Sequence, residues 1–316
     1  MGNDALMPEK EKVLVTGGAG FIGSHIVDKL IKNGHEVVIV DNLYTGSREN
    51  INYKAKFYEV DLISLKECKK IFEVEKPQIV IHQAGQISVQ KSLDNPIDDA
   101  NINIIGAINI LECCREYSTK KIIYASSAAI YGDPQYLGID EEHPYKPTSF
   151  YGISKLTPEY YIKLYSKLHN IKFTILRYSN VYGIRQNSKG EGGVISIFID
   201  NLLKNKQSII YGDGNQTRDF IYVKDVVNAN IKAISKGNNL ILNISTNKQI
   251  SVRELLDIII KTSKIKVSPI YMERRSGDII NSYMDNKKAK VALNWKPNYT
   301  LEQGIKEMLI HYGQNN

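Results

Sequence analysis

Cysteine is scarce in this sequence, and its pattern excludes several kinds of protein. Only Cys68, Cys113 and Cys114 are present, and no C-x-x-C pair occurs. An odd number of cysteines without paired spacing predicts neither a disulfide framework nor a zinc site, and no metal is expected. Unpaired thiols fit a reducing cytosol, so we expect a cytoplasmic protein.

Long apolar runs are also missing. No run approaches the roughly 18 residues of a membrane-spanning helix, so no membrane partner is expected. The opening stretch MGNDALMPEKEK has no apolar core and is interpreted as a disordered lead or a cloning remnant, not a secretory signal. With 42% hydrophobic and 24% charged residues, the 316-residue chain is typical of a globular protein of one or two domains.

Blocks of like charge are absent too, although the formal net charge is +7. A nucleic-acid partner would be one explanation of that charge, but the lysines are scattered along the chain. A solvated lysine-rich surface explains it better, and mild positive charge also suits an anionic small substrate. We therefore expect no nucleic-acid partner.

The first half of the chain alternates short apolar runs with helical segments. This order predicts an α/β fold with a Rossmann-type, doubly wound parallel sheet. Strands are predicted at Lys12–Thr16, Glu36–Asp41, Lys56–Asp61, Gln78–Ala84, Lys121–Ser127 and Lys172–Ser179. Helices are predicted at Phe21–Gly34, near Leu65–Val74, roughly from Asp98 to Tyr117, and around SFYGISK, which begins at Ser149.

The pattern changes after Tyr182. Glycine- and polar-rich loops are predicted at Gly183–Gly193 and Tyr211–Phe220, and Asn239–Thr246 again resembles a sheet strand. We therefore expect a dinucleotide-binding domain over residues 11–180, which also receives roughly 219–247. Residues 181–316 would mainly form a smaller α/β domain that binds the substrate.

A glycine-rich stretch, VTGGAGFIGSHI, follows the first predicted strand and opens the first predicted helix. Gly17 permits a tight turn, Gly20 lets the backbone approach a pyrophosphate at the helix N-terminus, and Gly23 allows close helix–strand packing. Asp41 ends the second strand, where a carboxylate accepts hydrogen bonds from ribose hydroxyls and repels a 2′-phosphate. This favours NAD over NADP; the alternative for Asp41 is an ordinary strand-end turn residue.

Tyr151 and Lys155 lie four residues apart in SFYGISK, so a helix places them on one face. Alone, this spacing means little, because tyrosine and lysine are abundant in the chain and ordinary surface residues would explain it. A tyrosine with its free pKa of about 10 is a poor base at neutral pH. A neighbouring ammonium group and a positive nicotinamide ring would both favour its phenolate form.

Taken together, these motifs resemble the NAD-dependent epimerase/dehydratase family of extended short-chain dehydrogenases/reductases. The resemblance runs from Lys12 to about Gly304. It rests on TGGAGFIGSH, VDNLYTG, HQAGQISV, YASSAAIYG, YGISK, LRYSNVYG, GDGNQTRDFIYVKDVV and RRSGD, in that order. It implies bound NAD, a UDP-sugar substrate and a homodimer formed by the helices near Asp98–Tyr117 and Ser149–His169. The apolar spacing of these helices is equally compatible with core burial.

The resemblance also implies roles for individual residues. The catalytic triad would be Ser127, Tyr151 and Lys155. Cofactor contacts would come from Gly17, Gly20, Phe21, Ile22, Gly23, Asp41, Asn42, Asp61, Leu62, Gln83, Ala84, Gly85, Tyr151 and Lys155. Substrate contacts would come from Ser127, Asn180, Arg218, Arg275, Asp278 and Ser282.

Three positions depart from what the family or a helix would favour. Gln83 and Gly85 stand where leucine and alanine are more usual, and we expect both to face the cofactor and be tolerated. Pro158 falls inside the catalytic helix, where it removes a backbone donor and crowds the carbonyl of Ser154. A kink or local loosening is expected there, with Tyr151 and Lys155 still correctly placed.

The residues after Ser127 bear on the reaction. Related dehydratases carry an Asp-Glu pair there and decarboxylases a nearby glutamate, whereas this chain has Ala128 and Ala129. The resemblance therefore implies NAD-dependent C4 epimerisation of UDP-hexoses through a 4-keto intermediate. The alternatives are another nucleotide-sugar modifier, such as a UDP-uronate 4-epimerase or a reductase, and an inactive NAD-binding sensor.

Ser282 bears on substrate range. In the family, the residue four positions after the RxGD aspartate lies beside the sugar's C2 substituent, and a tyrosine there restricts the pocket. The small Ser282 predicts room for N-acetylated sugars as well. The alternative is that loop length differs and Ser282 is an ordinary surface serine.

Overall fold

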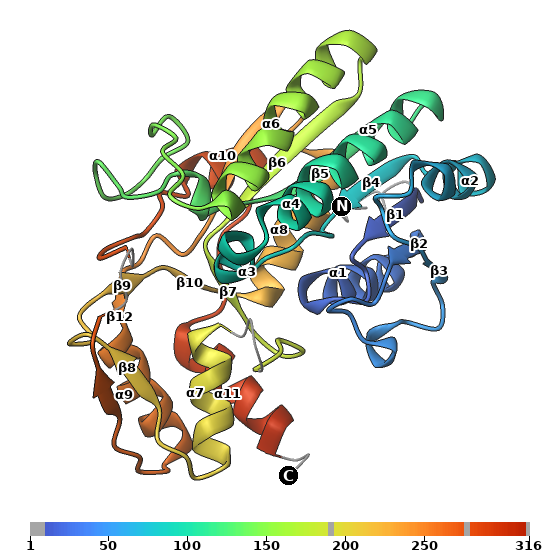
Figure 1. The fold of residues 1–316 in the computed structure, drawn as a ribbon. Coiled ribbons are helices and arrows are strands. Elements are labelled where there is room, and N and C mark those ends of the chain that lie inside the picture. The colour runs from blue at the N-terminus through green and yellow to red at the C-terminus, as the bar shows by residue number, and fades with distance from the viewer. Residues whose placement is uncertain (1–9, 189–192, 275–278, 314–316) are drawn as a thin grey trace, which may run out of the picture.

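A seven-stranded parallel sheet forms the centre of the molecule (Figure 1). The computed structural model describes residues 10–188, 193–274 and 279–313. The strand order is β11-β6-β5-β4-β1-β2-β3, so the order reverses between β1 and β4. The strands are β1 (Lys12–Thr16), β2 (Glu36–Asp41), β3 (Lys56–Glu59), β4 (Ile79–His82), β5 (Lys121–Ser127), β6 (Lys172–Tyr178) and β11 (Leu240–Ile244). The predicted fold class is confirmed.

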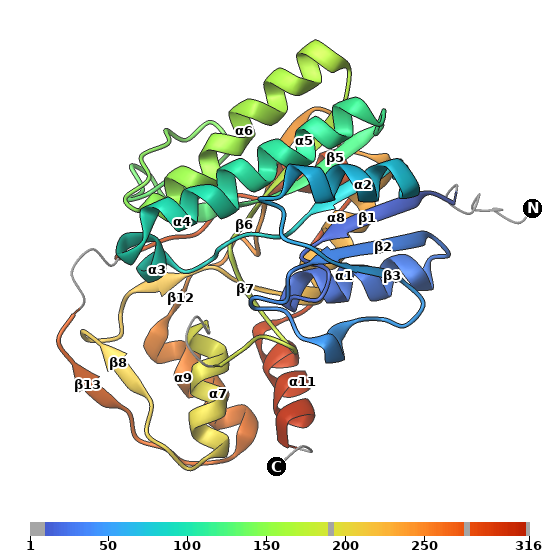
Figure 2. The ribbon, with the colours of Figure 1, turned by 45° about the vertical axis from the view of Figure 1, so that its right-hand side comes forward.

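Helices cover both faces of this sheet (Figures 1 and 2). One face carries α1 (Phe21–Lys32) and α8 (Val223–Ser235), and the other carries α2 (Leu65–Glu75), α5 (Gly106–Glu116) and α6 (Phe150–His169). Because successive strand residues point to opposite faces, Val13 and Val15 pack in the first layer and Leu14 in the second. Burial on both faces explains why the strands read as continuous apolar runs.

The helix expected from Asp98 to Tyr117 differs from the prediction. Its first part is α4 (Pro96–Ala100), preceded by the short helix α3 (Val89–Asp94). A π-helical segment, Asn101–Ile105, then joins α4 to α5. Such a segment shifts the facing of the following side chains and is frequent at functional sites.

Pro158 does not end its helix. α6 remains helical from Phe150 to His169, and the Thr157 hydroxyl donates to the Ile153 carbonyl at 2.9 Å. Tyr151 and Lys155 both lie before the proline, in the first turns of α6.

The second half of the chain forms most of a smaller lobe beneath the carboxyl ends of the strands (Figure 2). It contains α7 (Val194–Leu203), α9 (Val252–Ser263) and α11 (Leu301–Gly313), whereas α10 (Lys287–Leu293) packs beside β11 and α8 of the main sheet. Three two-stranded sheets pair β7 (Asn180–Tyr182) with β10 (Phe220–Tyr222), β9 (Thr217–Arg218) with β12 (Ile250–Ser251), and β8 (Ile209–Tyr211) with β13 (Ile270–Met272). The expected loop at Tyr211–Phe220 therefore contains a short strand. Within the described ranges, no helix has both the length and the apolar character needed to cross a membrane.

Candidate active site

One cavity of about 300 Å³ lies at the carboxyl ends of the sheet strands. It spans the point between β1 and β4 where the strand order reverses, which is where open α/β sheets bind their ligands. Every residue predicted to contact the cofactor lines this cavity, and so do all three members of the predicted triad. Residues as far apart in the sequence as Gly17 and Gln186 are thereby brought together.

The glycine loop has the shape that a pyrophosphate requires. Gly17 has a φ of +69°, and a Cβ there would lie 2.7 Å from the amide nitrogen of Ala84. A Cβ at Gly23 would lie 2.0 Å from the carbonyl oxygen of Gly17. α1 begins at Phe21 without a side-chain cap from Gly20, so its first N–H groups are available to an anion in the cavity.

Asp41 lies at the end of β2 with its carboxylate held in place. Its Oδ2 accepts from the Ala19 amide at 2.9 Å, and its Oδ1 accepts from the Leu43 amide at 2.8 Å. Burial raises the pKa of Asp41, while these two hydrogen bonds lower it. Since each carboxylate oxygen has about two acceptor sites, both oxygens retain capacity for ribose hydroxyls. Asn42 donates to Asp61 at 3.0 Å on the same side of the cavity.

These features fit NAD. A glycine loop at a helix N-terminus suits the pyrophosphate, and a fixed carboxylate suits a ribose without a 2′-phosphate. Leu62, next to Asp61 in the cavity lining, adds an apolar surface. In the described part of the chain, no group of three or more His, Cys, Asp or Glu could hold a metal ion.

The predicted triad converges at the other end of the cavity. Ser127 ends β5, and Tyr151 lies in the first turn of α6, which is capped by Ser149 accepting from the Gly152 amide at 3.1 Å. Burial raises the pKa of Tyr151, although its hydrogen bond with Ser127 lowers it. The phenol therefore needs further positive charge nearby to act as a base at neutral pH.

Lys155 lies one turn further along α6 and brings a positive charge to the lining of the same cavity. Its side chain is buried, and its Nζ lies 4.9 Å from the centre of the Tyr124 ring. Burial lowers the pKa of Lys155 to about 8, whereas the negative charges of Asp99 and Glu159 raise it. The ammonium form thus persists at neutral pH in spite of its burial.

A polar network beside the triad was not predicted from the sequence. Asn103, in the π-helical segment, donates to Asp99 at 3.2 Å and to the Ser154 hydroxyl at 2.9 Å. Its Oδ1 accepts from the Gln86 amide at 2.8 Å, and Gln86 donates to Asp99 at 2.8 Å. Asp99 and Asn103 are four residues apart in the sequence, a spacing that brings side chains together on a helix. This polar pair was the sequence feature from which the network could have been predicted.

The two departures from the family pattern each have a physical explanation. Gln83 lines the cavity, but its side-chain amide also donates to the Tyr178 hydroxyl at 3.0 Å and to Asn230 at 3.2 Å. Its polarity is therefore satisfied by two partners. At Gly85, a Cβ would lie 2.8 Å from the Asn103 Oδ1 and 3.5 Å from the Lys155 Nζ, so alanine would press on this network.

The predicted substrate residues are only partly brought together. Asn180 and Arg218 line a second cavity, which shares Val181 with the first. Ser282 lines neither cavity; its amide donates to the Thr217 carbonyl at 3.3 Å, next to Arg218 in sequence. Arg275 and Asp278 lie outside the described residues. The roles of these residues stay predictions.

Comparison with known proteins identifies the class. Residues 13–245 match the model of the NAD dependent epimerase/dehydratase family. The chain belongs to this family, and it is an NAD-dependent enzyme of the epimerase type.

Individual relatives narrow the comparison. A Methanocaldococcus jannaschii protein, provisionally named a UDP-glucose 4-epimerase, is 52% identical, over 96% of this chain and 99% of its own. The structure of UDP-glucose 4-epimerase from Thermotoga maritima with UDP-glucose is 41% identical with a TM-score of 0.95, over 96% of this chain and 99% of that one. The structure of UDP-N-acetylglucosamine 4-epimerase from Methanobrevibacter ruminantium with UDP-N-acetylmuramic acid is 32% identical with a TM-score of 0.92, over 97% and 99%.

Proposed function

We propose that this protein interconverts UDP-hexoses at C4 through a transient 4-keto sugar. The observation that carries the proposal is the convergence of Ser127, Tyr151 and Lys155 at one end of a cavity whose other end fits NAD. Bound NAD would take a hydride from the sugar carbon and return it. The protein's own task is to hold the sugar and to move one proton.

Tyr151 is the group that moves this proton. As a phenolate it accepts the proton of the C4 hydroxyl, and as a phenol it returns a proton to the same oxygen after the sugar has turned. Ser127 hydrogen-bonds to Tyr151 and can contact the same substrate oxygen. Lys155 favours the phenolate through its positive charge.

The residues after Ser127 favour epimerisation over elimination. Ala128 and Ala129 begin a short 3₁₀ turn, Ala128–Ile130, and neither side chain can donate or accept a proton. A 4-keto sugar held there lacks an acid or base from this segment that would remove water or a carboxylate. Return of hydride to the opposite face is then the remaining course.

Holding the diphosphate while the sugar turns would be the task of the second cavity. Asn180 and Arg218 line it, and we propose that Arg275 and Asp278 join them. The two domains expected from the sequence would then bind different ligands. Residues 11–180, with roughly 219–247, would bind the cofactor, and residues 181–316 would mainly bind the substrate. Pairing of β11 with β6 in the main sheet supports the inclusion of 219–247.

We further propose that N-acetylated UDP-hexoses are substrates. Ser282 is half-buried beside Thr217, and a small side chain leaves room for an acetamido group. The Methanobrevibacter relative, named for UDP-N-acetylglucosamine, supports this range. Ser282→Tyr should selectively reduce turnover of UDP-N-acetylgalactosamine relative to UDP-galactose; wild-type protein that turns over only UDP-galactose would contradict the proposal.

A homodimer and a cytoplasmic location complete the proposal. α6 exposes an apolar stripe, Phe150, Ile153, Tyr160, Leu164 and Leu168, which a second copy would cover. α3 and α4 lie beside it and expose Val89, Leu93 and Ile97. The three cysteines are free and buried, which fits a reducing compartment. A solution mass of one chain would refute the dimer.

Incubation of the purified protein with a panel of UDP-sugars, with chromatography of the products, tests the function. We expect C4 epimers to form from UDP-glucose and UDP-galactose without a lasting absorbance change at 340 nm. A lasting change would indicate a reductase, turnover confined to UDP-uronates would indicate a uronate epimerase, and no turnover of any sugar would indicate a sensor.

A further inference from the structure

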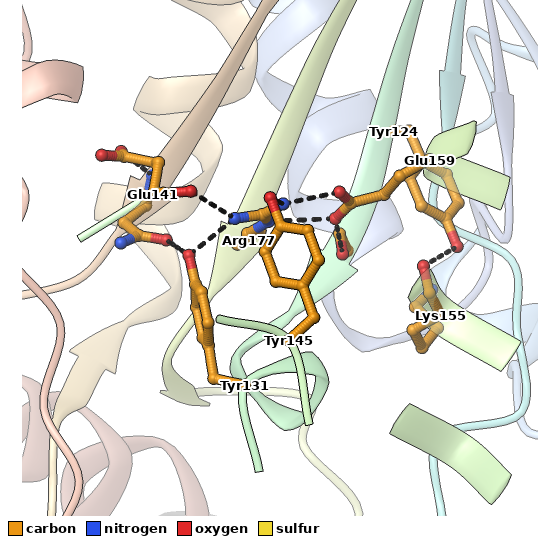
Figure 3. Close-up of polar contacts among 9 residues, drawn as sticks. Tyr124, Tyr131, Glu141, Tyr145, Lys155, Glu159 and Arg177 are labelled. Carbon is orange, nitrogen blue, oxygen red and sulfur yellow. Dashed lines mark hydrogen bonds and ion pairs between the residues drawn. The ribbon is translucent and has the colours of Figure 1, made fainter. Parts of the chain in front are cut away.

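A buried carboxylate lies directly behind the triad, and the reaction as described does not use it. Glu159 follows Lys155 by one turn of α6, and its side chain is 1% exposed. Its Oε1 accepts from the Ser126 hydroxyl at 2.6 Å and from Arg177 Nε at 3.0 Å, and its Oε2 accepts from Arg177 Nη2 at 2.7 Å (Figure 3). Ser126 is the residue before Ser127.

Arg177 is the cation of this pair, and its hydrogen-bonding capacity is fully used. Besides its two bonds to Glu159, it donates to the Tyr145 hydroxyl at 2.9 Å, the Tyr131 hydroxyl at 2.8 Å and the Glu141 carbonyl at 3.4 Å. These are five bonds from five N–H groups. The guanidinium carbon also lies 4.7 Å from the Tyr145 ring centre and 5.1 Å from that of Tyr131. A buried ion pair is costly unless satisfied in this way.

The pair connects the strand that carries the catalytic serine to the helix that carries the other two triad members. Arg177 on β6 lies opposite Ser126 on β5, so both point toward α6. Two residues earlier on β5, Tyr124 donates its hydroxyl proton to the Lys155 carbonyl at 3.2 Å. α6 is therefore fastened to β5 at residues 155 and 159.

We propose that Glu159, held by Arg177, is a positioning residue that docks the catalytic helix on β5 and places a buried negative charge one helical turn from Lys155. This inference rests on the proposed roles of Ser127, Tyr151 and Lys155. It deepens the proposed function, because it names a residue that affects the charge of Lys155 and so the reactivity of the triad.

The charges around Lys155 give the direction of the effect. The titratable and charged groups around it are His82 on β4, Asp99 on α4, Tyr124 on β5, Tyr151 and Glu159 on α6 and, behind Glu159, Arg177 on β6. Of these, Asp99 and Glu159 raise the pKa of Lys155 against the lowering effect of burial. Without Glu159, Lys155 loses its proton at a lower pH, and the Tyr151 phenolate loses its support at that pH.

The test is the pH profile of kcat for Glu159→Gln at saturating UDP-galactose, measured on the protein with its bound NAD. We expect kcat to fall about tenfold or more at pH 8, and the basic limb of the profile to move to lower pH by on the order of one unit. KM should change less than kcat, because Glu159 does not line either cavity.

The control is Glu75→Gln. Glu75 is another buried helical glutamate with ion-pair partners, but it lies at the amino end of the sheet beside Lys12. Its substitution should lower the melting temperature without moving the basic limb. A basic limb at the wild-type pH in Glu159→Gln would overturn the proposal, whatever the loss of rate.

A double variant covers the case in which Glu159→Gln does not fold. Glu159→Met with Arg177→Met removes both charges and leaves an apolar pair, which buried ion pairs often tolerate. It should fold, and its basic limb should still move to lower pH, but by less than loss of the carboxylate alone would cause, because the opposing charge of Arg177 is removed with it; a wild-type profile would overturn the proposal. If wild-type protein itself turns over no UDP-sugar, the proposed function fails instead, so the two failures are distinguishable.

Discussion

Two buried glutamates, Glu75 and Glu159, lie at opposite ends of the same sheet. Each is paired with cations, but the two ion pairs have different roles. Glu75 ends α2 beside the amino ends of β1 and β3, where Lys12 and Lys56 bind it at 3.2 and 3.1 Å. Those lysine side chains are 24% and 57% exposed, so water screens the pair. Glu159 lies near the carboxyl ends, and its partner Arg177 is 0% exposed.

The two ion pairs differ in their access to solvent, and this difference determines whether each one affects stability alone or also the reacting groups. At the amino end, burial raises the pKa of Glu75, but bonds from Tyr58, Lys56 and Lys12 outweigh it and leave the pKa lowered, so the pair contributes to stability. At the carboxyl end, a dry ion pair lies one helical turn from Lys155 and one residue from Ser127. Charge in that place affects the reacting groups, because little water screens it.

The largest effect on kcat is expected at the carboxyl ends of the strands, where the triad lies. Tyr151→Phe should lower kcat by about 10²–10⁴-fold, because it removes the group that moves the proton. Bound NAD and the melting temperature should stay near wild type. Tyr161→Phe, on the same helix but exposed and outside the proposed dimer stripe, is the matched control and should keep full activity. Near-normal turnover in Tyr151→Phe would contradict the assigned role.

The second prediction compares the two ion pairs directly. Arg177→Met leaves the Glu159 carboxylate buried without its cation and should reduce the free energy of unfolding by about 3–5 kcal/mol. Lys56→Met, at the solvent-screened pair, should cost about 0–1 kcal/mol. Urea unfolding of both variants measures the two losses in free energy of unfolding. Equal losses would contradict the claim that the two ion pairs differ in their screening by solvent.

A smaller effect, on cofactor affinity, is expected from substitution of Asp41, beside which the cofactor's ribose would lie. Asp41→Ala removes a charged acceptor worth about 1.5–3 kcal/mol, so the affinity for NAD should fall roughly 10- to 100-fold. The preference for NAD over NADP should narrow, since the carboxylate no longer repels a 2′-phosphate. Parallel titrations of both cofactors measure this. A wild-type protein that prefers NADP would show the assignment of Asp41 to be wrong.

Asp219, also near the carboxyl ends, should show a pH effect of its own. Its carboxylate accepts from the amides of Thr246 at 2.8 Å and Asn247 at 3.0 Å. Burial nevertheless raises its pKa to about 6. Between about pH 4 and 6 the folded state therefore holds a proton that the unfolded state releases, and this contribution to stability falls as the pH rises.

Asp219→Asn should remove that pH dependence and cost about 1–3 kcal/mol, because an amide NH₂ then faces backbone N–H donors. Urea unfolding at pH 4.5 and pH 7 measures both effects. A variant whose stability has the same pH dependence as wild type would show that another group causes it.

Local patterns predicted much of this molecule. The bounds of β1, β2 and β5 follow from continuous apolar runs, and the Gly17–Gly23 loop follows from its place between strand and helix. The π-helical segment was missed, because a one-residue change in helical pitch leaves little trace in apolar spacing. Glu159 and Arg177 were missed for another reason: they lie on different elements, and only tertiary packing brings their charges together.

The most direct test of the central claim is conversion of UDP-galactose that carries deuterium at C4. If Tyr151 exchanges only the hydroxyl proton while the C4 hydrogen travels as hydride and returns, the UDP-glucose formed keeps its deuterium at C4 and the water gains none. We predict this result for wild-type protein, with the conversion suppressed in Tyr151→Phe. Release of the label to water, or a product with unchanged C4 configuration, would contradict the account.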